Sequence, residues 1–200
     1  NKGQDNAVMV TGVVMVGGII INKSPVNLDM VTPLARLTYE FNVIAVPADS
    51  PIKNAQDFVK ALKADPGAMS IAGGSAGGID HITLALIAGV SGVPVDKLNY
   101  VAFASGAEVA TSTAGGKVKA AISGLSELKP QADSGRVRLI ASSSEKSRAG
   151  IASLKEQGID VVTGNWRGLV GPPEMSDAAR KVWIGRFDRM SKTQEWRDGL

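Results

Sequence analysis

Three turns of small residues carry the chemistry that this sequence offers. Each follows a β-rich stretch and precedes a helical pattern, and they are Gly73–Gly78, Ala104–Ala107 and Ser123–Ser126. In a parallel sheet such turns gather at the carboxyl ends of the strands, where backbone N–H groups and helix N-termini face one bound anion. The pattern predicts an anion site that needs no catalytic group.

Hydrogen bonds, rather than helix dipoles, are expected to set the affinity of such a site. Ser75, Ser105 and Ser123 supply hydroxyls at equivalent positions of the three turns. A charge-assisted hydrogen bond contributes about 1.5–3 kcal/mol, against about 0.3–1 kcal/mol from a helix dipole. Tight packing of strand against helix is the competing interpretation of the first turn.

Two titratable residues lie beside these turns. His81 is the only histidine and the chain has no cysteine, so we predict no metal site, and we expect His81 to hydrogen-bond the first turn. Glu108 carries a negative charge, which does not suit the lining of an anion site. It either caps its own helix or binds a ligand hydroxyl or amine.

Two other kinds of site are disfavoured by spacing. Residues 73–77 fit the G-x-S-x-G nucleophile elbow, but His81 lies in the helix that this elbow opens, whereas the hydrolase fold brings its histidine from a later loop. The sequence contains no G-x-G-x-x-G, and Lys117 is followed by Val118 rather than by the Ser or Thr of a P-loop. We therefore expect neither a hydrolase nor a nucleotide-binding protein.

The elements that must position these turns alternate between strand and helix. The predicted strands are Val8–Thr11, Leu37–Val46, Met69–Ala72, Leu98–Phe103, Val118–Ile122, Val137–Ala141 and Asp160–Thr163. The predicted helices follow Asn54, include Ile82–Gly89, Ala107–Ala114 and Ser153–Gln157, and end with a long helix capped by Ser176, whose apolar stripe is Ala179, Val182, Trp183, Phe187 and Met190. This alternation predicts the α/β class with a parallel sheet.

The composition argues against nucleic acid as a partner and against a membrane-spanning helix. The chain has 200 residues, enough for one or two domains, and its 22 Lys and Arg against 19 Asp and Glu do not favour nucleic acid as a partner. The uncharged stretch Ala7–Ile21 is shorter than the roughly 20 residues of a membrane-spanning helix. We interpret it as a buried strand followed by a packed helix.

Several longer motifs follow one another along nearly the whole chain. They are Val46–Lys53, Ala72–His81, Phe103–Glu108, Gly115–Val118, Ser123–Glu127, Gly135–Ala141, Lys155–Ile159, Gly164–Gly168 and Pro172–Pro173. In this order they resemble the substrate-binding proteins of tripartite tricarboxylate transporters, also called the Bug family of periplasmic receptors.

The resemblance implies an α/β protein of the type II periplasmic-binding-protein kind, whose two lobes close over a small carboxylate. It places residues 1–46 and 142–200 in the first lobe and residues 47–141 in the second. It also implies that the first lobe is incomplete, since the first strand of relatives and its ligand-touching loop lie upstream of Asn1. A chain without that segment is expected to bind ligand weakly or not at all.

The same resemblance implies ligand contacts in both lobes. Relatives often bind a carboxylate through ordered water and backbone groups, which agrees with turns that contain no arginine. Ala107 stands where relatives frequently have glycine, and it narrows the space for ligand. The implied ligand-binding residues are Thr11 and Gly12 in the first lobe and Gly74, Ser75, Ala76, Gly77, Gly78, Ser105, Gly106, Ala107 and Ser123 in the second.

The function implied is that of a periplasmic receptor without enzymatic activity or cofactor. It would capture a di- or tricarboxylate, or a similar organic acid, for the small and large integral membrane subunits of a transporter. The effector-binding domain of a LysR-type transcription regulator has the same two-lobed architecture and is the alternative. An upstream signal peptide would favour the receptor, and an upstream helix-turn-helix would favour the regulator.

Overall fold

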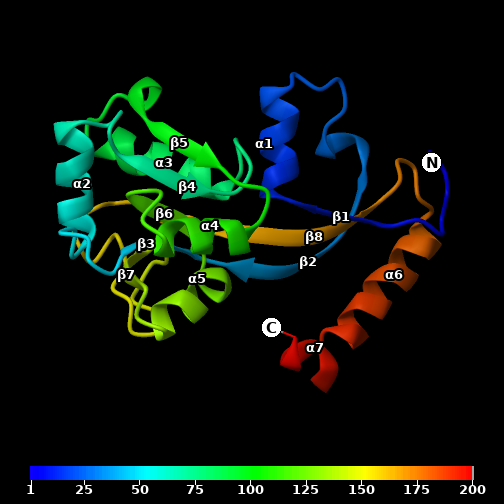
Figure 1. Ribbon diagram of the computed structural model, residues 1–200. Coiled ribbons are helices and arrows are strands. Elements are labelled where there is room, and N and C mark those ends of the chain that lie inside the picture. The colour runs from blue at the N-terminus through cyan, green and yellow to red at the C-terminus, as the bar shows by residue number, and fades with distance from the viewer. Residues whose placement is uncertain (200) are drawn as a thin grey trace. The chain divides into compact units, whose positions relative to one another are not determined.

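The structure, a computed structural model, describes residues 1–199. It divides into unit 1, which comprises Asn1–Tyr39 and the chain from Asn165 onward, and unit 2, which comprises Glu40–Gly164. Unit 1 therefore contains the dark blue start and the orange-to-red end of the ribbon in Figure 1. The mixture of helices with two sheets confirms the predicted α/β class.

Unit 2 is built on a five-stranded sheet in the order β5-β4-β6-β3-β7. Its strands are β3 (Asn42–Pro47), β4 (Ser70–Gly73), β5 (Asn99–Ala102), β6 (Ala120–Gly124) and β7 (Val137–Ser142). Its helices are α2 (Ala55–Ala64), α3 (Ile79–Val90), the 3₁₀ turn η2 (Val95–Lys97), α4 (Gly106–Ala114) and α5 (Leu125–Asp133). Asn54 caps α2 through its side chain, as predicted.

Helices cover both faces of this sheet. On β3, Ile44 and Val46 pack into one apolar cluster with α2 and α3, whereas Val43 and Ala45 pack into a second cluster with α4 and α5. Successive side chains of a strand point to opposite faces, so a strand covered on both faces is apolar throughout. The result is a three-layer arrangement of helices, sheet and helices.

The sheet is mixed, so the prediction of a parallel sheet is confirmed for β4, β5 and β6 and was wrong for the pairs that β3 makes with β6 and β7. β4 runs parallel to β5 and to β6, but β3 runs antiparallel to both β6 and β7. The parallel strands β4, β5 and β6 are joined by helical crossovers, as the alternating pattern requires. β3 enters directly from β2 of the other sheet, so no crossover helix sets its direction.

Unit 1 has a three-stranded sheet in the order β1-β8-β2, and β1 pairs with β8 antiparallel. The elements are β1 (Met9–Gly12), α1 (Val13–Ile21), the 3₁₀ turn η1 (Leu28–Met30), β2 (Thr32–Glu40), β8 (Asn165–Gly171), α6 (Asp177–Met190) and α7 (Gln194–Asp198). Phe187 of α6 packs with Leu34 and Met175 in a small core. Val182, predicted on the same stripe, is 51% exposed, so that prediction was wrong.

Other predicted elements were also wrong. Ser153–Gln157 is not a helix: Ser153 forms an isolated β-bridge with Ser142, and residues 154–157 form turns. Asp160–Thr163 is not a strand, whereas β8, which follows it at once, was missed. Leu37–Val46 is interrupted at Phe41, because its two halves join different sheets.

The two units have limits that differ from the predicted lobes. The chain passes from one unit to the other at Tyr39–Glu40 and at Gly164–Asn165. β3 and residues 143–164, which the lobe limits at 46 and 142 assign largely to the first lobe, lie in unit 2. The division into lobes that close on a ligand stays a prediction.

None of the helices within residues 1–199 is long and apolar enough to cross a membrane. The apolar stretch near the start forms β1 and the nine-residue helix α1.

Candidate functional site

The three predicted turns lie at one edge of the unit 2 sheet. They follow the carboxyl ends of β4, β5 and β6, which are adjacent and parallel. Each turn leads into the helix that follows, α3, α4 or α5. The sequence therefore predicted correctly that these bends share one rim of the sheet.

The first turn is tied down by internal hydrogen bonds. The Gly74 N–H donates to Asp80 Oδ2 at 2.8 Å, the Gly77 N–H to His81 Nδ1 at 3.1 Å and the Gly78 N–H to the Ser75 carbonyl at 2.9 Å. The predicted hydrogen bond from this turn to His81 is thus present. The prediction that amides of the turn are free for an anion was wrong for these three glycines.

Gly77 has a backbone requirement of its own. Its φ of +77° lies in the left-handed region, which glycine adopts without a steric penalty. The conformation turns the chain sharply between the exposed residues Ser75 and Ala76 and the start of α3. This position therefore shapes the turn rather than offering a donor.

In the second turn Ser105 is the N-cap of α4, and Glu108 reaches back to the residue before it. The Glu108 N–H donates to Ser105 Oγ at 3.3 Å, and the Ala104 N–H donates to Glu108 Oε2 at 3.1 Å. Glu108 therefore holds the chain just before its own helix through Ala104, whereas the cap itself is Ser105. Its alternative role, binding a ligand, stays a prediction. A shallow groove of about 480 Å³ lies beside this turn and is lined by Phe103, Ala107, Glu108, Thr111 and Ser112.

The third turn differs from the second, so Ser123 and Ser105 are not equivalent. Ser123 lies within β6, is 2% exposed, and donates its hydroxyl to Glu127 Oε2. The same carboxylate oxygen accepts the Gly124 N–H at 3.2 Å. Glu127 also fills the space that a side chain at Gly106 would need. Ser123 is thus a support for Glu127 in this structure.

Several rim amides have no hydrogen-bond partner within residues 1–199. Among them are those of Ser75 and Ala76 in the first turn and of Gly106 and Ala107 at the start of α4. Ser75, Ala76 and Ala107 are exposed. These amides, with the Ser75 hydroxyl, are the donors that the rim offers to a ligand.

Carboxylates surround these donors. Asp80, Glu108 and Glu127 each belong to the first turn of the helix that follows one of the three bends. Burial raises the pKa of the Asp80 carboxyl above its ordinary value, hydrogen bonds from Gly74 and Asn42 oppose this, and the charges of Glu127 and Glu40 add to the rise. The rim therefore combines amide donors with acidic acceptors.

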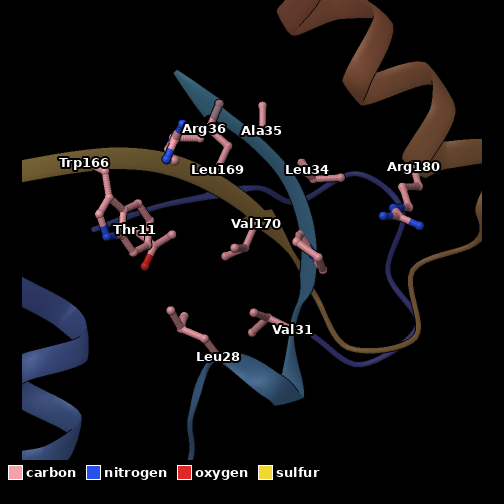
Figure 2. A pocket seen from close by; sticks show the side chains of 12 residues that line it. Thr11, Leu28, Val31, Leu34, Ala35, Arg36, Trp166, Leu169, Val170 and Arg180 are labelled. Carbon is pink, nitrogen blue, oxygen red and sulfur yellow. The ribbon is translucent and has the colours of Figure 1, made fainter. Parts of the chain in front are cut away.

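Thr11 and Gly12 lie in unit 1. Thr11 is 5% exposed, its hydroxyl donates to Met15 Sδ at 3.2 Å, and it lines a largely apolar cavity of about 490 Å³. Figure 2 shows this cavity, with Leu28 and Val170 among its walls. Gly12 precedes α1, and Trp166 O leaves no room for a side chain there. Their predicted contact with a ligand stays a prediction.

Four residues that hold the rim were not predicted from the sequence: Asn42, Asp80, Tyr100 and Glu127. Asp80 and Glu127 carried a signal, since acidic residues are favoured in the first turn of a helix. Asn42 and Tyr100 carried none, because only the sheet brings β3 and β5 beside the first turn. Ser75, the serine of the G-x-S-x-G motif, makes no hydrogen bond to His81 within residues 1–199. His81 Nδ1 accepts the Gly77 N–H.

Comparison with known proteins points to one family. The model of the tripartite tricarboxylate transporter family receptor matches residues 8–186. A curated relative from Cupriavidus necator, "UPF0065 protein in gbd 5'region", is 32% identical over 158 residues. The match covers 76% of this chain and 46% of the relative, so the chain spans less than half of that protein's length.

Solved structures share the fold. A TctC solute-binding protein from Polaromonas, crystallised without ligand, is 26% identical with a TM-score of 0.79, and the match covers 100% of this chain and 69% of that one. MatC from Rhodopseudomonas palustris, solved with bound malate, is 16% identical with a TM-score of 0.85, and the match covers 98% of this chain and 68% of that one.

Proposed function

Because this chain belongs to the tripartite tricarboxylate transporter family of receptors, we propose that it is a periplasmic solute-binding protein for a small carboxylate. It would pass this ligand to the small and large integral membrane subunits of a tripartite transporter. The observation that carries the proposal is the single rim at which three turns follow adjacent parallel strands. Malate bound to a protein of the same fold supports the ligand class.

We infer that the ligand carboxylate is held by the unpaired amides of Ser75, Ala76, Gly106 and Ala107 and by the Ser75 hydroxyl. Such charge-assisted hydrogen bonds contribute about 1.5–3 kcal/mol each. Four other residues predicted to bind the ligand have donors that are already used inside the protein, and they would shape the rim instead of donating to the ligand. They are Gly74, Gly77, Gly78 and Ser123.

The acidic side chains of the rim select among carboxylates. Two carboxylates about 4 Å apart in water repel by about 1 kcal/mol, so Glu108 and Glu127 oppose a ligand that offers only negative charge. A ligand hydroxyl can donate to them and offset this repulsion. We therefore propose a hydroxy acid, with malate preferred over succinate, which lacks only the hydroxyl.

Titration calorimetry tests the proposal. Malate, succinate and citrate are titrated into the protein, its Ser75→Ala variant and the control Ser91→Ala, whose site lies at the other end of α3. We expect malate to bind more tightly than succinate, and Ser75→Ala to weaken malate binding about tenfold while Ser91→Ala has no effect. Because a chain without the upstream segment is expected to bind weakly, the same titrations are made with a form that spans the full length of the relatives. Absence of binding by every carboxylate in that form would contradict the proposed function.

A further inference from the structure

We propose that Asp80 is the positioning residue of the first turn: it fastens Gly74 to the sheet, so that the Ser75 and Ala76 amides stay turned toward the ligand. This role rests on the proposed function of the rim. Asp80 would then contribute to affinity although it need not touch the ligand itself.

Asp80 joins the turn to strand β3, which lies beyond β6 in the sheet. Its Oδ2 accepts the Gly74 N–H at 2.8 Å, and its Oδ1 accepts from Asn42 Nδ2 at 2.6 Å. Asn42 is itself held, because its N–H donates to Ser143 Oγ at 3.0 Å and its carbonyl accepts the Ser143 N–H at 2.9 Å. Both carboxylate oxygens are therefore occupied by donors from ordered backbone or side chains.

Tyr100 and His81 hold the rest of the turn. Tyr100 Oη donates to the Gly74 carbonyl at 2.8 Å, so both polar groups of Gly74 have partners. The Tyr100 ring stacks on His81 with ring centroids 4.4 Å apart, and His81 Nδ1 accepts the Gly77 N–H. Gly74 and Gly77 are thus fixed on either side of Ser75 and Ala76.

The residues of this network are closely packed. A side chain at Gly73 would meet the Tyr100 hydroxyl and Asp80 Cβ, which therefore lie directly against the backbone of β4. Burial raises the pKa of the Asp80 carboxyl, so its ionised form costs fold stability. A first-turn acid that served only the helix dipole would avoid this cost by facing solvent. The hydrogen bond to the turn accounts for the buried position of this carboxylate.

The test measures the turn without any ligand. Amide hydrogen exchange at Gly74 and Gly77 is followed by NMR in the 200-residue chain, in Asp80→Ala, in Asp80→Asn and in the control Asp96→Asn. Asp96 is an exposed residue of η2. Asp80→Ala should accelerate exchange at Gly74 about tenfold or more, because the N–H loses a charged acceptor.

Asp80→Asn should remain close to the unmodified chain. The new amide oxygen can accept the Gly74 N–H while Asn42 turns its own oxygen toward the new NH₂ group. Because Asn has the shape of Asp without its charge, rescue by this variant shows that the carboxylate's charge is not required to hold Gly74. Unchanged exchange at Gly74 in Asp80→Ala overturns the proposal. If that variant does not fold, Asn42→Ala replaces it, with the same two outcomes.

Malate calorimetry on the same variants connects the turn to affinity. Asp80→Ala should weaken binding about tenfold, and Asp80→Asn should largely restore it. Equal malate affinity in all variants, with a loosened turn in Asp80→Ala, overturns the link to affinity. These titrations also use the form that spans the full length of the relatives. If that form binds no malate, the proposed function fails, but the exchange data still decide whether Asp80 fixes the turn.

Discussion

Replacing Gly73 by alanine should destabilise unit 2, because the end of β4 has no space for a methyl group. The added Cβ would lie 2.9 Å from Asp80 Cβ and would overlap the Tyr100 hydroxyl. Neither neighbour yields easily, since Asp80 Cβ is attached to helix α3 and Tyr100 Oη is the end of a rigid ring.

The expected loss combines two effects. Overpacking typically costs about 1–3 kcal/mol. Displacing the Tyr100 hydroxyl from the Gly74 carbonyl adds about 1 kcal/mol for a broken hydrogen bond. A total of about 2–4 kcal/mol, divided by a urea slope of about 2 kcal/mol per M, lowers the unfolding midpoint by about 1–2 M.

Far-UV circular dichroism is the appropriate probe. All 3 tryptophans, Trp166, Trp183 and Trp196, lie in unit 1, so their fluorescence does not report directly on Gly73. Gly89→Ala is the matched control, because Gly89 is an exposed position of α3 where an added methyl group meets no atom of a neighbouring element within 4 Å. Gly89→Ala should raise the free energy of unfolding by up to about 0.5–1 kcal/mol, because alanine favours the helix more than glycine does. Equal midpoints for Gly73→Ala and the unmodified chain would refute the reasoning.

Three further substitutions test the supports of the rim and of its sheet. Ser105→Ala removes the side-chain cap of α4 and should cost about 1 kcal/mol in a urea titration, and a loss as small as that of Ser112→Ala would count against the cap. Arg138→Met should cost about 2 kcal/mol, since the guanidinium donates to the carbonyls of Ala48, Ser50 and Ile52; unchanged stability would show these bonds to be dispensable. Burial raises the pKa of the Asp80 carboxyl, so the folded protein binds its proton more tightly than the unfolded chain does. The contribution of Asp80 to stability therefore falls as the pH rises from about 3.8 toward the folded-state pKa. Asp80→Asn should remove this part of the pH dependence from melting temperatures measured between about pH 4 and pH 7. An identical slope in both proteins would contradict it.

Sequence patterns predicted the structure well where the pattern is local. Asn54 and Ser176 cap helices through their own side chains, as their types predict. The apolar runs of β4, β5 and β6 alternate with helices, which is enough to make these strands parallel and to bring their turns to one edge. The family follows from longer motifs in a fixed order.

Patterns failed where the outcome depends on distant partners. Phe41 interrupts what looked like one strand, because its two halves pair in different sheets. The turn amides looked free, but Asp80 accepts that of Gly74 and Glu127 accepts that of Gly124. A carboxylate three to six residues along the chain reaches back to its turn only when the helix places it there, and sequence spacing alone did not distinguish this from an exposed acid.

The amino-acid order by itself determined the α/β class, the helix caps and the shared position of the three bends, because each depends on propensity and on the handedness of short crossovers. Only the tertiary structure decided which donors of the rim remain unpaired. Asn42 and Tyr100 come from β3 and β5, which lie on opposite sides of β4 in the sheet, and hydrogen bonds between residues so far apart in sequence exist only once the sheet has formed.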